Sequence, residues 1–186
     1  MDLRTAKTER AIRSAFLELR AKKPLERITV KELCQRAEIH KSTFYDHYED
    51  LYALSDALEN QVLDSVLENL THPEDLFDNP ERFTRELFLA YCSQDALLHV
   101  LFSDGRGAGL VQKIQRGVKE LAFARRPDLR EDPVANIALS YAIYGGYYAL
   151  EENRSYGLEQ IVQVVASASR DVQKLLQDRR DPQKNL

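Results

Sequence analysis

The chain has 186 residues, of which 44% are hydrophobic and 30% are charged, a composition typical of a folded globular protein and not of a disordered one. Its apolar runs are only a few residues long, which excludes a membrane-spanning helix. The N-terminal sequence MDLRTAKTER contains no apolar segment of the kind that secretion needs. We therefore expect a cytoplasmic protein that has no membrane partner.

Charge is distributed unevenly along the chain, whose net charge is −4. Residues 1–45 hold eleven Lys and Arg against six Asp and Glu, whereas the other 141 residues hold fifteen against twenty-four. If the chain binds a polyanion, we expect the basic N-terminal part to bind it. The two cysteines, Cys34 and Cys92, match neither a disulfide framework nor a metal-ligand spacing, so we predict no metal and no cofactor.

The predicted elements are all helices, because no stretch alternates with period two over the length of a strand. A first helix covers residues 5–22, with Ile12, Phe16 and Leu19 on one face, and Pro24 prevents its continuation. Thr29 has the side chain of an N-cap for a short second helix, since its hydroxyl can accept from an amide two or three residues later. The fold class is therefore predicted to be all-α.

Further caps and breaks predict the remaining helices. A third short helix begins near Lys41, and Asp50 caps a long fourth helix that ends before Pro73. Asn79 and Asp132 each precede a proline, which is the pattern of an N-cap followed by proline at the first helical position. The later helices are expected at 80–91, 93–102, 110–125, 133–153 and 158–177, with a plain glycine-rich loop at 103–109.

Two short helices joined by a tight turn, behind a longer amphipathic helix, form a helix-turn-helix pattern. On this interpretation, residues 40–48 are the recognition helix. Ser42 and Thr43 are small and carry hydroxyls that can reach base edges, and Lys41 adds attraction to the phosphates. Tyr45 and His47 are stiff side chains with polar tips that suit contacts to the DNA backbone.

The segment ITVKELCQRAEIHKSTFYDHYEDLYAL resembles the DNA-binding domain of the tetracycline-repressor (TetR) family, and the resemblance extends over residues 5–58. It implies that Thr29 contacts phosphate and that Lys31 reaches a base. It also implies that Lys41, Ser42 and Thr43 read bases, while Tyr45 and His47 hold the backbone. Beyond residue 58 only the architecture is similar, and there the family forms a homodimer through its last two helices.

Three positions depart from the family pattern. Glu38 replaces the usual turn glycine, and a left-handed conformation at this residue costs on the order of 1 kcal/mol. Asp46 and Leu51 stand where the family often has basic residues, which weakens the attraction to DNA. Lys7, Arg10 and Lys22 are candidates for compensating charge.

The resemblance implies a homodimeric transcriptional regulator that binds a palindromic double-stranded DNA operator, as a ligand-responsive repressor and not as an enzyme. Residues 1–48 are the expected DNA-binding domain, 49–178 the ligand-binding and dimerisation domain, and 179–186 a flexible tail. The dimer interface is predicted on the helices at 133–153 and 158–177. Its apolar positions include Ile137, Ile161, Val164, Val165, Val172 and Leu175.

A small-molecule effector is expected between aromatic residues that have polar tips. The predicted pocket consists of Phe88, Tyr91, His99, Tyr141 and Tyr144, and it favours a neutral or cationic aromatic compound. Taken alone, His99 in its apolar setting is interpreted first as a buried core histidine and only then as a ligand contact. The adjacent Gly145 and Gly146 indicate a close approach of another helix or of a ligand to this part of the chain.

Two alternatives to a ligand-responsive regulator remain open. One is a small all-helical enzyme that uses His99 with Tyr91 or Asp95, although no nucleophile and base have a known catalytic spacing. The other is a DNA-binding factor that binds no ligand and uses its second domain for protein partners.

Overall fold

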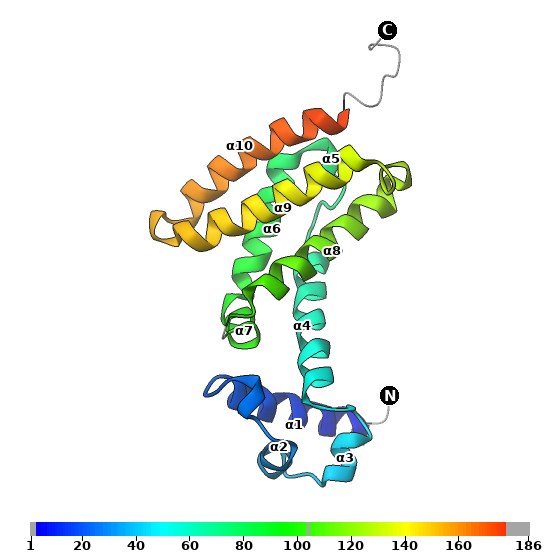
Figure 1. The fold of residues 1–186 in the computed structure, drawn as a ribbon, viewed down its shortest axis with the longest axis vertical. Helices are drawn as coiled ribbons and strands as arrows, with labels where there is room; N and C mark the ends of the chain where they lie inside the picture. Colours follow the sequence, from blue (N-terminus) through cyan, green and yellow to red (C-terminus); the bar gives the residue numbers. More distant parts are fainter. Residues whose placement is uncertain (1–2, 104, 178–186) are drawn as a thin grey trace. The chain divides into compact units, whose positions relative to one another are not determined.

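The computed structural model describes residues 3–103 and 105–177, and it contains no β-strand among them. The all-α prediction is thereby confirmed, while the expected tail at 179–186 lies outside the described residues. None of the helices in this described part is both long and apolar enough to cross a bilayer. The α-helices are α1 (Leu3–Arg20), α2 (Val30–Ala37), α3 (Lys41–Tyr45), α4 (Leu51–Glu68), α5 (Asp75–Asp78), α6 (Pro80–Ser93), α7 (Asp95–Leu101), α8 (Gly107–Arg125), α9 (Pro133–Asn153) and α10 (Leu158–Gln177) (Figure 1).

The helices group into two compact units. Unit 1 contains the described residues up to Val62 together with Asp95–Gly107, and unit 2 contains Leu63–Gln94 together with the described residues from Ala108 onward. The long helix α4 contributes its first part to unit 1 and its last part to unit 2. Unit 1 is therefore larger than the segment 1–48 that the sequence predicts for DNA binding.

Unit 1 is built on the buried face of α1. Ile12 and Phe16 are fully buried there, as are Leu33 on α2 and Leu54 on α4, and α1 packs against both α2 and α7. The 3-10 turn η1 (Leu25–Arg27) follows Pro24 and leads into α2, a turn that the sequence did not predict. Helix α2 packs in turn against α3, so the core around α1 supports both short helices (Figure 1).

The predicted caps are present. The Thr29 hydroxyl accepts from the amide of Glu32 at 3.2 Å, and the Asp50 carboxylate accepts from the amide of Ala53 at 2.7 Å. In unit 2, Asn79 caps α6 and Asp132 caps α9, each before a proline. The helix starts were predictable because a side-chain acceptor at the cap satisfies amides that have no partner within the helix.

Unit 2 packs α10 against both α6 and α9, and one of its core clusters joins α5, α8 and α9 through Phe77, Phe123 and Leu139. The short helix α5 was not predicted; its Asp75 pairs with Arg82 at the start of α6. Helix α8 begins at Gly107 and not at residue 110. The expectation of a plain loop over 103–109 is therefore wrong for its last three residues, which belong to a regular helix.

Candidate nucleic-acid interface and candidate ligand cavity

Helices α2 and α3 are joined by the three-residue turn 38–40. Glu38 has φ 56° and ψ 44°, which is the left-handed conformation expected where the family usually has a glycine. The amide of Ile39 donates to the carbonyl of Cys34 at 3.0 Å. Helix α3 has five residues and is shorter than the expected 40–48, because the amides of His47 and Tyr48 both donate to the carbonyl of Phe44 in a closing turn. Phe44 itself is fully buried. The turn and this anchor together fix the orientation of α3 against α2.

The side chains proposed for DNA contacts gather around the start of α2 and along α3. Two of them, Thr43 and His47, are half-buried. The others are exposed, namely Thr29, Lys31, Lys41, Ser42 and Tyr45. The structure thus places all seven at or near the surface.

The aromatic residues of this segment support one another. The ring of Tyr45 meets the edge of the buried Phe44 at a centroid distance of 5.4 Å, and His47 stacks on Tyr48 at 6.3 Å. Ring contacts restrict the rotamers of Tyr45 and His47, so less conformational entropy is lost when their polar tips bind a partner. A phenol and an imidazole held in this way can donate hydrogen bonds to phosphate oxygens.

Charges around α2 and α3 differ in how far they are neutralised. Lys23 pairs with Glu32 and Arg36 pairs with Glu18, so these two cations already have acidic neighbours. Within the described part of the chain, no ion pair involves Lys31 or Lys41. These two lysines therefore keep their charge available for an anionic partner.

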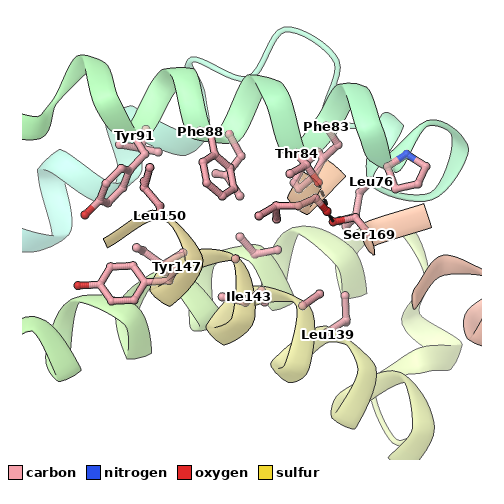
Figure 2. A pocket seen from close by; sticks show the side chains of 18 of the residues that line it. Leu76, Phe83, Thr84, Phe88, Tyr91, Leu139, Ile143, Tyr147, Leu150 and Ser169 are labelled. Atoms are coloured by element: carbon pink, nitrogen blue, oxygen red, sulfur yellow. Dashed lines mark hydrogen bonds between the residues drawn. The ribbon is translucent and has the colours of Figure 1, made fainter. Parts of the chain in front are cut away.

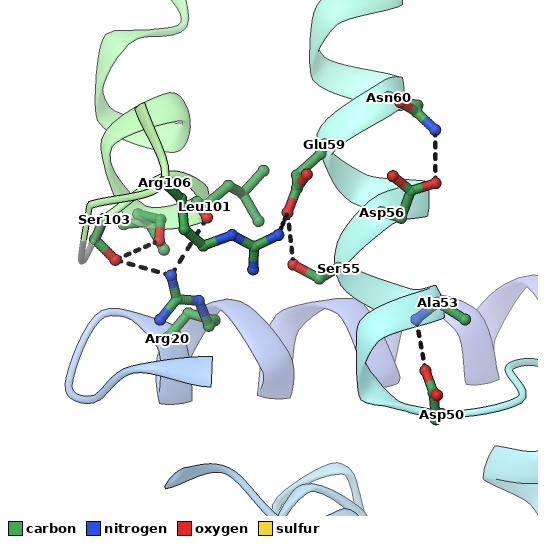
Figure 3. Close-up of polar contacts among 11 residues, drawn as sticks. Arg20, Asp50, Ala53, Ser55, Asp56, Glu59, Asn60, Leu101, Ser103 and Arg106 are labelled. Carbon is green, nitrogen blue, oxygen red and sulfur yellow. Dashed lines mark hydrogen bonds and ion pairs between the residues drawn. The ribbon is translucent and has the colours of Figure 1, made fainter. Parts of the chain in front are cut away.

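Two sets of buried polar contacts connect distant segments of unit 1 (Figure 3). Arg20, which is 3% exposed, donates to the carbonyl of Leu101 at 3.3 Å and to the hydroxyl of Ser103 at 2.8 Å. The buried carboxylate of Glu59 accepts from Ser55 and from Arg106, both at 2.8 Å. Sequence reasoning missed both sets, because a lone Arg or Glu beside an apolar stripe has the pattern of an ordinary surface residue.

Unit 2 contains a cavity of about 120 Å³, which is lined by α4, α6, α8, α9 and α10 and by Leu76 of α5. Figure 2 shows Phe83, Phe88 and Tyr91 of α6 facing Leu139, Ile143 and Tyr147 of α9. Tyr91 and Tyr147 lie toward one end of the cavity, and the hydrogen bond between Thr84 and Ser169 lies toward the other (Figure 2). The walls are almost entirely hydrocarbon.

Only part of the predicted pocket lines this cavity. Phe88 and Tyr91 do so, but Tyr147 contributes the ring from α9, and neither Tyr141 nor Tyr144 is among the lining residues. Tyr141 is 70% exposed, because it lies on the opposite face of α9. That helix carries apolar or aromatic residues all round, so its sequence could not indicate which face is buried.

His99 lies outside the cavity as well. It is exposed on α7, which belongs to unit 1, so the alternative of a buried core histidine is wrong. The Tyr91 hydroxyl, which the enzyme alternative pairs with His99, donates instead to the carboxylate of Glu151 at 3.1 Å. No group of three or more His, Cys, Asp or Glu that could hold a metal ion occurs in the described part of the chain.

The polar groups at the cavity already bond to one another. Thr84 donates to the hydroxyl of Ser169 at 3.1 Å, and that hydroxyl donates to the carbonyl of Val165 at 2.9 Å. Burial and the nearby Glu151 carboxylate raise the pKa of Tyr91, and the same two causes raise the pKa of Tyr147. Both phenols are therefore neutral at physiological pH.

No protein-family model matches this sequence, and neither a curated protein nor a solved structure is significantly similar to it.

Proposed function

We propose that the protein is a DNA-binding transcriptional regulator of the tetracycline-repressor type, which binds a palindromic operator as a homodimer and acts as a ligand-responsive repressor. The observation that carries the proposal is the surface of α2 and α3. There the buried Phe44 anchors a short helix, while Lys41, Ser42 and Tyr45 on the same helix are exposed. A rigid helix with an outward set of hydroxyls and cations suits the major groove.

The charge distribution supports the same site. The excess of Lys and Arg is confined to residues 1–45, which include α1, α2 and α3, whereas the rest of the chain is acidic. A polyanion is attracted to the first region and repelled by the second. Lys31 and Lys41 supply the local attraction, and the exposed Glu38 and Asp46 reduce it. We therefore expect moderate affinity with a strong dependence on salt.

The exposed apolar residues of α9 and α10 support the proposed dimer. Ile137 and Tyr141 are 69% and 70% exposed one turn apart on α9, and Val164 on α10 is 65% exposed. Large apolar side chains that remain this exposed on packed neighbouring helices mark a surface that another molecule covers. A second copy of the chain would place two α3 helices on one face of the duplex, which matches a palindromic site.

Three other positions assigned to that interface have a different role. Ile161 is buried within the chain, and Val165 and Val172 are half-buried and line the cavity. The side chain of Leu175 lies outside the described part of the structure. The proposed interface is therefore narrower than the sequence indicates, and it centres on Ile137, Tyr141 and Val164.

DNA binding can be tested with duplexes taken from upstream of the protein's own gene, by fluorescence anisotropy. Tyr45→Phe and His47→Ala should each weaken binding by about 1–3 kcal/mol, because each removes a donor to phosphate without disturbing the buried Phe44. Tyr156→Phe is the matched control, since Tyr156 is 68% exposed in unit 2 and should not affect affinity. Parent-like binding by both test variants would refute the assignment of α3 as the reading helix.

Base reading and backbone holding can be separated. Thr43→Ala should change the preferred base at one position of each half-site, because its hydroxyl and methyl are proposed to touch a base edge. Binding to a library of half-site variants measures this preference. An unchanged preference profile would remove Thr43 from the base-reading set.

The dimer has its own test. Sedimentation velocity at micromolar concentration should show a dimer for the parent chain and a monomer for Ile137→Asp, which buries a charge at the proposed interface. Leu89→Asp is the control, because Leu89 is 53% exposed on α6 and outside this face. A monomeric parent would exclude the proposed interface.

A further inference from the structure

We infer that the cavity of unit 2 binds a small, uncharged and largely apolar molecule, of the size of a monocyclic aromatic or a short alkyl chain. As an effector site this cavity rests on the proposed function, whereas binding itself is a property of unit 2 that can be measured without DNA. The sequence alone favoured a neutral or cationic aromatic compound. In the structure, three features narrow this class of ligand: the size of the cavity, its apolar walls, and the hydrogen bonds that its polar groups already make.

Size is the first constraint. The cavity measures about 120 Å³. Apolar cavities on the order of 150 Å³ in protein cores stay dry and admit a molecule as large as benzene. The interior lined by Phe88, Leu139 and Ile143 therefore suits a single ring or a short alkyl chain.

The polar groups at the cavity argue against a charged ligand. The hydroxyl of Tyr91 donates to Glu151, the hydroxyl of Thr84 donates to Ser169, and the amide of Gln173 donates to the carbonyl of Phe77. Each of these groups therefore already has a partner within the protein. An anion entering the cavity would have to break one of these bonds or remain without a donor, and both outcomes disfavour binding.

Charged neighbours do not change this conclusion. Lys113 is the one charged residue that lines the cavity in the described part of the chain, and it already has an interaction partner. No carboxylate lines the cavity among those residues, since Glu151 lies beyond Tyr91, where Arg154 donates to it at 2.7 Å. A cation would lose its hydration without gaining a counter-charge among the lining residues, which disfavours cationic aromatics as well.

The glycine pair of α9 offers a matched way to fill the cavity. A Cβ on Gly146, which lines the cavity, would lie 3.4 Å from Val165 and 3.6 Å from the ring of Phe88. A Cβ on Gly145 would meet nothing within 4 Å. The same substitution at these adjacent positions therefore changes helix propensity equally but occupies the cavity only at Gly146.

The experiment compares three probes of one shape, toluene, benzylamine and benzoate, which are neutral, cationic and anionic at pH 7. Binding is measured on the full chain without DNA, by calorimetry and by the ligand-induced rise in melting temperature. We expect toluene to bind at least about tenfold more tightly than either ion, a difference of about 1.4 kcal/mol. Equal or tighter binding of benzoate or benzylamine would overturn the inference, as would the absence of toluene binding.

The location is tested with Gly146→Leu and Gly145→Leu. The first should abolish toluene binding and the second should retain it. If Gly146→Leu does not fold, Gly146→Ala, which adds one methyl at ordinary contact distance, should still weaken toluene binding severalfold relative to Gly145→Ala. Unchanged binding in folded Gly146 variants would place the site elsewhere.

Failure of this inference can be told apart from failure of the proposed function. Operator binding by the parent chain is measured separately and without any ligand. If toluene binds in the cavity but the chain binds no DNA, the ligand site stands and the regulator is refuted. If the chain binds its operator but toluene does not bind, the regulator stands and the apolar ligand class is refuted.

Discussion

The two units bury their interiors in different ways. Unit 1 contains charged and polar groups, Arg20, Glu59 and Ser55, that are almost wholly buried and are bonded to partners. Unit 2 also buries Asp75, Thr84 and Gln173 with partners, but it differs in surrounding a cavity with hydrocarbon walls. Buried hydrogen bonds are directional and specify one arrangement, whereas apolar contacts around an empty space tolerate small shifts. The first property suits the DNA-reading surface proposed for unit 1, and the second suits the ligand site proposed for unit 2.

The largest expected effect is the loss of unfolding free energy when a leucine in each unit is shortened to alanine, which tests how tightly each interior is packed. Leu33→Ala in unit 1 should lower the free energy of unfolding by about 3–5 kcal/mol, because Leu33 is fully buried in close packing. Leu87→Ala in unit 2 should lower it by no more than about 2 kcal/mol, since Leu87 is half-buried and already borders the cavity. Urea denaturation measures the totals, and hydrogen exchange locates each loss. Equal losses would show that the cavity does not loosen unit 2.

The buried ion pair of unit 1 comes next. Arg106→Met should destabilise the protein by about 2–3 kcal/mol, because the Glu59 carboxylate stays buried while losing its cation. This figure lies at the low end for buried pairs, since the Arg106 side chain is 32% exposed and water can partly replace it.

Arg85→Met is the matched control in unit 2, where the pair with Glu159 is exposed on both sides and should contribute about 0–1 kcal/mol. A similar effect of the two variants would contradict the view that burial makes the Arg106 pair important. Thermal and urea denaturation of both proteins under one set of conditions make the comparison.

Backbone strain should give effects of opposite sign in the two units. Glu38→Gly should stabilise unit 1 by about 0.5–1 kcal/mol, because glycine relieves the left-handed conformation but adds freedom to the unfolded chain. Gly157→Ala should instead destabilise unit 2 by about 1–3 kcal/mol, because φ is 86° there. Nothing lies within 4 Å of the added methyl, so the effect comes from backbone strain and not from a clash. Melting temperatures of the two variants should therefore move in opposite directions, and a shift in the same direction would contradict the strain argument.

Acid sensitivity should be the smallest effect. The hydrogen bond from Arg82 holds the pKa of Asp75 below its ordinary value. A depressed folded-state pKa means that the stabilisation is present above the unfolded value of about 3.9 and is lost as pH falls through the folded value. Melting temperature should thus drop more steeply below about pH 4 for the parent than for Asp75→Asn.

Asp171→Asn is the control for acid sensitivity. Its carboxylate also has a lowered pKa, because Lys174 donates to it, but both side chains of that pair are largely exposed. Surface pairs of this kind contribute little, so the variant should follow the parent curve. A parent-like curve for Asp75→Asn as well would show that Asp75 and Arg82 do not stabilise the junction of α5 and α6.

Local chemistry made much of the fold predictable. The all-α class, the caps at Thr29, Asp50, Asn79 and Asp132, and the left-handed turn at Glu38 are all present in the structure. Each cap depends on a side chain and a backbone group within a few residues, so sequence spacing is enough to predict it, whereas the turn at Glu38 was expected from the family pattern. The seven residues proposed for DNA contacts also come from one continuous segment; the structure places them at or near the surface, and their contacts with DNA stay a prediction.

Features that depend on contacts between distant residues were decided only by the tertiary structure. The sequence assigned Tyr141 and Tyr144 to the pocket, but the fold turns Tyr147 toward it, because α9 is apolar on every side and its neighbours choose the buried face. Arg20 and Glu59 look like surface residues until Ser103 and Arg106, more than forty residues away, supply their partners. Periodicity and capping act within a helix, whereas burial and pairing act between helices, and only packing brings those groups together.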